Sequence, residues 1–112
     1  MTGRTLRLGA GAGFAGDRLD PAVDLARRGE LDYLIFECLG ERTVATAHAR
    51  RLADPAAGYD PLLATRLRAV LPHTSPSGTR LVTNSGAANP QAAGELAAGL
   101  AKQLGVPTRI AV

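Results

Sequence analysis

Two carboxylates and an arginine follow an apolar run in the first half of the chain. Glu37 comes directly after Leu31–Phe36, Glu41 lies four residues later, and Arg42 is adjacent. A carboxylate whose pKa is raised by burial can transfer protons, and a guanidinium beside it can pair with a substrate carboxylate. Glu41 has a simpler explanation, because the helix dipole favours an acidic residue at a helix N-terminus. Glu37 is therefore the stronger candidate for acid–base chemistry.

A glycine-rich turn, Gly9–Asp17, follows the first apolar segment. Gly11, Gly13 and Gly16 satisfy the dinucleotide-binding fingerprint, and Glu37 lies 21 residues beyond the last of them. In the dinucleotide fold the helix opens at the third glycine, whereas here the first helix signal comes four residues later. This late start favours a ligand other than a nucleotide. The third possibility, after a nucleotide and another ligand, is that the turn is purely structural.

Polar and small residues also follow a later apolar segment. Asn84 and Asn89 offer amide donors and acceptors, Ser85 adds a hydroxyl, and Gly86 lets a ligand approach the backbone. The free N–H groups at the start of the next helix point toward any anion held there. Capping of that helix explains Asn89 alone, so the other three residues indicate a binding role.

Cysteine and histidine give weaker signals. Cys38 lies at a strand end near a helix start, where the pKa of a thiol falls, but a small buried thiol is the commoner explanation. His48 shares the Val44–Leu52 face of a predicted helix, which favours a packed position, and His73 is expected at the surface. Neither histidine has acidic residues at a metal-binding spacing, so no metal is expected.

These segments belong to an alternating pattern of strands and helices. Strands are predicted at Arg4–Ala10, Leu31–Phe36, Arg80–Thr83 and Thr108–Val112. Helices are predicted from Asp20 to Gly29, over Glu41–Ala53, from Asp60 to Pro72, where the proline should end or kink the helix, and from Asn89 to Gly105. The order β-α-β-α-α-β-α-β predicts an α/β fold, a parallel sheet of about four strands with covering helices. Because the carboxyl ends of parallel strands share one edge, we expect the three polar loops to form one site.

The composition limits the class of protein. The chain has 112 residues, which suits one domain, and its net charge is +3. Its arginines are scattered and aromatic residues are few, which predicts solvated arginines and no nucleic-acid binding. The scattered arginines are Arg27, Arg28, Arg50, Arg51, Arg66 and Arg68. A single cysteine excludes an internal disulfide, and no run approaches the roughly 18 apolar residues of a membrane span, so we expect a cytoplasmic protein.

The last predicted strand lacks a covering helix. Thr108–Val112 would leave apolar surface and backbone groups exposed at a sheet edge. We therefore expect residues 1–112 to form a single partial domain, the N-terminal part of a larger α/β domain. The alternative is a partner chain or a second copy that covers this edge.

Four segments together resemble the N-terminal region of the acyclic terpene utilisation (AtuA-type) family: Leu8–Arg18, Leu31–Thr43, Gly58–Leu63 and Val82–Pro90. The resemblance covers essentially all 112 residues, with the segments in family order. Small departures occur at Gly40, where the family usually has alanine, and at Ser85, which is often methionine. Members occur with the bacterial pathway that degrades citronellol and geraniol through acyl-CoA intermediates.

The resemblance implies an enzyme of small-molecule catabolism that acts on a carboxylate or acyl-CoA substrate. Hydratase or lyase chemistry is expected, with no cofactor beyond CoA as substrate carrier. The residues expected to be catalytic are Glu37, Arg42 and Asp17, and those expected to bind substrate are Gly11, Gly13, Gly16, Arg18, Asn84, Ser85, Gly86 and Asn89. The alternatives are a nucleotide-binding module and a non-catalytic assembly domain completed by a partner chain.

Overall fold

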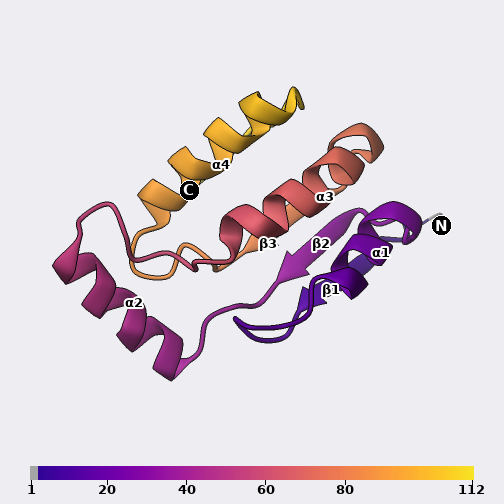
Figure 1. Cartoon of the computed structure of the whole chain (residues 1–112). Helices are drawn as coiled ribbons and strands as arrows, with labels where there is room; N and C mark the ends of the chain where they lie inside the picture. The colour runs from indigo at the N-terminus through magenta and orange to yellow at the C-terminus, as the bar shows by residue number, and fades with distance from the viewer. Residues whose placement is uncertain (1–2) are drawn as a thin grey trace.

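Parallel strands alternate with helices in the structure, a computed structural model that describes residues 3–112 (Figure 1). The elements are β1 (Leu8–Ala12), α1 (Asp20–Arg28), β2 (Tyr33–Phe36), α2 (Glu41–Ala53), α3 (Leu63–Ser77), β3 (Arg80–Thr83) and α4 (Pro90–Leu104). The strands form a three-stranded parallel sheet in the order β1-β2-β3, which confirms the α/β class. Among these helices, none is long and apolar enough to cross a membrane.

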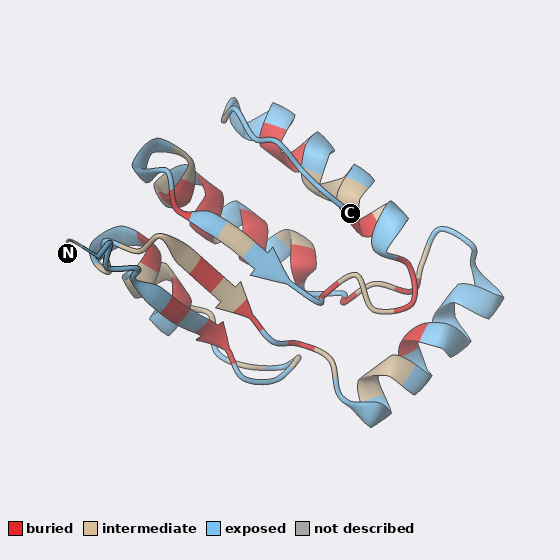
Figure 2. Cartoon of the chain, turned by 180° about the vertical axis from the view of Figure 1, so that it is seen from behind, coloured by how far each residue is buried: buried red, intermediate tan, exposed pale blue. Residues whose placement is uncertain are grey.

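The helices α1, α3 and α4 form a layer beside the sheet. α1 packs on β1 and α3, and α4 packs on α3, whereas α2 extends away from this body (Figure 1). The core has two parts, visible as the buried stripes in Figure 2. One part joins the sheet to the helices through Ala22, Leu34, Phe36 and Val70, and the other joins α3 to α4 around Leu67 and its neighbours.

The opposite side of the sheet carries apolar side chains. Along β2, Leu34 and Phe36 are buried against the helices, while Ile35 points the other way and is half-buried. Ile35 pairs with Val82, which is 49% exposed, and Leu8 on β1 is 64% exposed on the same side. We call the surface formed by Leu8, Ile35 and Val82 the open sheet face.

The predicted elements agree with the structure where the local signals are strong. The helix Glu41–Ala53 and the strand Arg80–Thr83 are confirmed with the predicted bounds. The first strand is not at Arg4–Ala10, because the pairing with β2 extends two residues further into the glycine-rich segment. A glycine is needed at position 11 of this strand, because an added Cβ would lie only 2.7 Å from the Phe36 ring.

Pro72 was expected to end or kink the third helix, and the expected end is wrong. α3 starts three residues after Asp60, continues through Pro72 and Pro76, and ends at Gly78, whose φ of 75° is left-handed. Both prolines are exposed. The carbonyl groups freed by the missing proline N–H groups can therefore bond to water, which makes an interior proline tolerable.

The predicted fourth strand, Thr108–Val112, is not formed within the described residues, whose sheet has three strands. This segment lies beside α4 instead (Figure 2). Ser75 donates a hydrogen bond to the Pro107 carbonyl, at 3.2 Å, and Val112 packs against Gly94. These contacts with α3 and α4 place the segment outside the sheet.

The predicted packed face of α2 is also wrong. His48 is exposed, Leu52 is 89% exposed and Val44 is only half-buried. The buried residue of the helix is Ala47. Arg51 ties the helix to the loop before α4 by donating to the Ala88 carbonyl at 2.5 Å.

Candidate functional site

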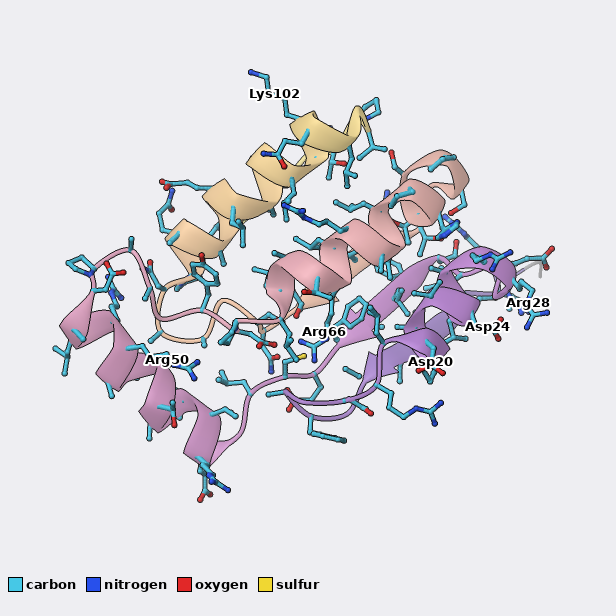
Figure 3. All side chains as sticks on the ribbon, in the orientation of Figure 1. Asp20, Asp24, Arg28, Arg50, Arg66 and Lys102 are labelled. Carbon is cyan, nitrogen blue, oxygen red and sulfur yellow. The ribbon has the colours of Figure 1, made fainter. Side chains whose placement is uncertain are left out.

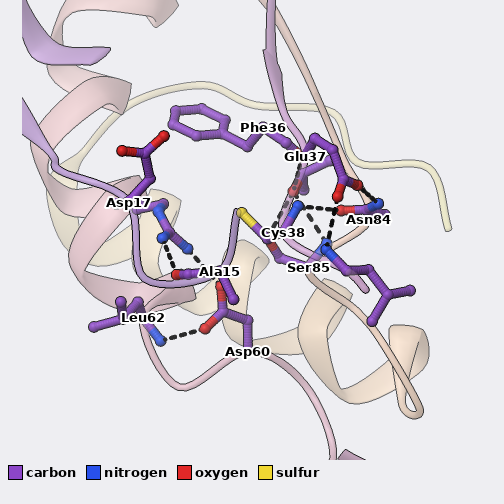
Figure 4. Close-up of polar contacts among 12 residues, drawn as sticks. Ala15, Asp17, Phe36, Glu37, Cys38, Asp60, Leu62, Asn84 and Ser85 are labelled. Atoms are coloured by element: carbon purple, nitrogen blue, oxygen red, sulfur yellow. Dashed lines mark hydrogen bonds and ion pairs between the residues drawn. The ribbon is translucent and has the colours of Figure 1, made fainter. Parts of the chain in front are cut away.

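The loops that follow β1, β2 and β3 converge at one end of the sheet (Figure 4). The expected convergence of the three polar segments is therefore present. It follows from the register, because Phe36 pairs with Thr83 and the next residues, Glu37 and Asn84, are placed side by side. A cleft at the carboxyl ends of parallel strands is where ligands bind in open α/β sheets.

Glu37 and Asn84 form the polar centre of this edge. The Asn84 amide donates to one carboxylate oxygen of Glu37, and the Leu39 N–H donates to the other at 3.3 Å. The amide oxygen of Asn84 accepts a hydrogen bond from the Cys38 N–H at 2.7 Å. Glu37 and Asn84 are both exposed. The carboxylate is thus held in one orientation while it remains accessible from solvent.

The glycine turn is braced by Asp17. The Asp17 carboxylate accepts hydrogen bonds from the N–H groups of Gly13 and Arg18, both at 2.8 Å. These two bonds hold the pKa of Asp17 below its ordinary value, so the group is an anion at neutral pH. α1 starts at Asp20, four residues after Gly16, as the sequence predicted. The helix N-terminus is therefore not where a dinucleotide pyrophosphate would need it.

A buried ion pair connects the turn to the other loops. Arg66 and Asp60 are 5% and 6% exposed, and the Arg66 Nη1 lies 2.5 Å from the Asp60 Oδ2. The other terminal nitrogen of the Arg66 guanidinium, Nη2, donates to the Ala15 carbonyl in the turn. Figure 3 shows Arg66 directed into the molecule, whereas Lys102 extends outward. The expectation that Arg66 is solvated is wrong.

Ser85, Gly86 and Asn89 shape the loop between β3 and α4. Ser85 is 1% exposed and its hydroxyl lies 2.7 Å from that of Thr83. Asn89 is buried, donates to two carbonyl groups before α3, and accepts from the Ala92 N–H at 3.3 Å, so it caps α4 as predicted. A side chain at Gly86 would meet Pro90, 2.7 Å away. Substrate contacts by these residues stay predictions.

Cys38 is a buried thiol between these loops. Its side chain is 2% exposed. Burial raises the pKa of Cys38, and a hydrogen bond with Ser85 and the charge of Arg66 act in the opposite direction. A thiol of raised pKa is protonated at neutral pH, which favours a packing role over nucleophilic attack.

The structure does not gather all the predicted charged groups. Arg18 forms an exposed ion pair with Asp20, at 2.7 Å. Arg42 lies on the projecting helix α2, is exposed, and makes no ion pair with a residue in the range 3–112. Over the same range, no three His, Cys, Asp or Glu side chains are grouped to hold a metal ion.

A comparison with protein families identifies the family of the chain. The model of the acyclic terpene utilisation family protein AtuA matches residues 6–112. The chain belongs to the AtuA family. No curated protein and no solved structure matches it. The matched range includes the glycine turn, Glu37, Asn84 and the Asp60–Arg66 pair, so the whole candidate site lies within the AtuA-family region.

In this AtuA-family chain a groove of about 800 Å³ lies beside the site. Leucine and alanine side chains of α3 and α4, the edge of β3 and the segment Pro107–Val112 form its walls. Thr83 and Gly86 line its end next to Asn84. The groove therefore extends from the polar centre along the edge of the sheet.

Asp60 and Arg66 are part of this candidate site but were not predicted from the sequence to belong to it. A signal was present, because Arg66 lies between Leu63 and Val70 on the apolar stripe of the predicted helix. An arginine in a stripe that buries its neighbours needs a buried acceptor. Asp60, six residues earlier, is that acceptor.

Proposed function

We propose that the carboxyl ends of the three strands bind a small-molecule carboxylate or acyl-CoA formed in acyclic terpene breakdown, and that Glu37 transfers protons there. The observation that carries this proposal is the exposed Glu37 carboxylate held by Asn84 at the centre of three converging loops. The adjacent apolar groove supports an acyl substrate, because its leucine and alanine lining suits a hydrocarbon chain.

The geometry suits hydratase or lyase chemistry. Such reactions remove or add a proton beside a carbonyl, and a fixed carboxylate can act as the base and then as the acid. The Asn84 amide and the N–H groups of Phe14–Gly16 would donate to the substrate carbonyl or carboxylate, because the N–H groups at either end of this segment already bond within the turn. Arg18 would exchange Asp20 for a substrate carboxylate, and Arg42 would approach only with movement of α2. We place this activity in the cytoplasm, with CoA as the only carrier required.

The first test replaces the proposed base. Glu37→Gln keeps the size of the side chain and one of its two acceptor oxygens, so we expect native circular dichroism and a loss of turnover of about 10²- to 10⁴-fold. Turnover of the CoA thioester of geranic acid is the measurement, because its double bond beside the carbonyl can add water. Glu95→Gln is the control, because Glu95 is exposed on α4 and accepts a hydrogen bond from the nearby Gln91 side chain. Normal turnover by Glu37→Gln would contradict the proposal.

Two alternative functions predict different results. A nucleotide-binding module would be stabilised against heat by NAD, FAD or ATP and not by the CoA thioester. A non-catalytic assembly domain is favoured by the open sheet face, since Leu8 and Val82 leave apolar surface uncovered. That domain would keep pathway activity in Glu37→Gln.

A further inference from the structure

Arg66 occupies a position on α3 that packing alone would give to an apolar residue. Leu63, Leu67 and Val70 surround it along the buried stripe of the helix. Its partner Asp60 is equally buried. A buried ion pair is often no more stabilising than well-packed apolar residues of the same volume. Stability of α3 is therefore an insufficient explanation for this pair.

The hydrogen bonds of the pair extend beyond α3. Arg66 reaches the Ala15 carbonyl, 51 residues away in the chain. The Asp60 N–H donates to the Ser85 carbonyl at 2.8 Å, and the Asp60 Oδ1 accepts from the Leu62 N–H at 3.0 Å. One ion pair thus joins the glycine turn, the start of α3 and the loop after β3 (Figure 4).

The glycine turn has few other restraints. Gly13 and Arg18 donate to Asp17, and the Asp17 N–H donates to the Phe14 carbonyl at 3.2 Å, so these bonds are local. Within residues 3–112, Arg66 is the one side chain outside the turn that bonds to the backbone of residues 13–18. The Ala15 side chain also packs against the core. The guanidinium therefore sets where the turn lies above the strand ends.

We propose that Arg66, held in place by Asp60, is the positioning residue of this site and fixes the glycine turn in the conformation that binds ligand. Arginine suits this role because its planar group donates to two acceptors at once, whereas a lysine ammonium at the same place would satisfy Asp60 without reaching Ala15. The part of the proposal that concerns ligand rests on the proposed function. The ordering of the glycine turn by Arg66 does not rest on the proposed function.

Amide hydrogen exchange without ligand tests the positioning. The variants are Arg66→Lys and the uncharged pair Asp60→Asn/Arg66→Met, with Arg68→Met as the control, since Arg68 is exposed on the same helix. We expect exchange in residues 13–17 to speed up about tenfold in both variants, while β2 amides exchange as in the wild type. If the turn keeps its wild-type rates and only the melting temperature changes, the pair is structural and the proposal is overturned.

Ligand affinity gives the second readout. We expect the Kd for the CoA thioester of geranic acid to rise about tenfold in Arg66→Lys and to stay unchanged in Arg68→Met. A loosened turn with unchanged affinity would overturn the positioning role. If the wild type does not bind the thioester, the proposed function fails, while the exchange rates still decide whether Arg66 positions the turn.

Discussion

Glu37 and Asp17 are carboxylates at neighbouring strand ends, but their partners suit them to different tasks. Asp17 accepts from two backbone N–H groups, which keep it ionised and fix the turn. Glu37 is held by the Asn84 side chain and by one backbone N–H, that of Leu39, and it is exposed. Two backbone bonds suit Asp17 to bracing the turn, whereas exposure and a side-chain partner suit Glu37 to the proton transfer that we propose for it.

The brace at Asp17 predicts a response to acid. Because hydrogen bonds lower the folded-state pKa of Asp17 below 3.8, its support of the turn is fully present above pH 3.8 and is lost as the pH falls through the lowered pKa. Asp17→Asn keeps one acceptor oxygen, so we expect the Gly13 amide to exchange about three- to tenfold faster at neutral pH. The acid-induced loosening should disappear in this variant. Asp24→Asn, at an exposed site on α1, is the control, and equal effects in both variants would contradict the role of Asp17.

At the scale of elements, the sequence predicted what local signals determine. Asn89 followed by proline located the start of α4, and the apolar run before Glu37 located β2. The predicted helix end at Pro72 was wrong because the effect of a proline on a helix depends on whether water reaches the freed carbonyl, which is a tertiary property. The segment Thr108–Val112 has strand composition, but pairing depends on its neighbours in space.

Two glycines of α4 should respond oppositely to the same substitution. Gly99 is exposed inside the helix with nothing within 4 Å of an added Cβ, so Gly99→Ala should raise the free energy of unfolding by about 0.5 to 1 kcal/mol. Gly105 caps the helix at a φ of 66°, so Gly105→Ala should lower it by about 1 kcal/mol. Urea unfolding of both variants measures the difference. Effects of the same sign would contradict the end of α4 at Gly105.

At the scale of the molecule, the convergence of three loops was predictable because parallel strands align their carboxyl ends. The partners within the site were not predictable in the same way. Asn84 and Glu37 are 47 residues apart, and their contact depends on the register of β2 and β3. The Asp60–Arg66 pair was missed because scattered arginines usually lie in solvent. The available signal for this pair was a charged residue, Arg66, within the apolar stripe of its helix.

The open sheet face predicts association of the whole chain. Leu8 and Val82 are 64% and 49% exposed, and the helices lie on the other side of the sheet, so covering this face with a second copy would remove apolar surface from water. Val82→Glu places a carboxylate two residues from Arg80 on the same side of β3, so it should leave the fold intact and shift the chain toward the monomer. Sedimentation velocity over a range of concentrations measures this shift. Leu52→Glu is the control, because Leu52 is 89% exposed on α2, away from the sheet. If both variants associate like the wild type, the open sheet face does not mediate self-association. If the wild type is monomeric at every concentration, a second copy does not cover the open sheet face.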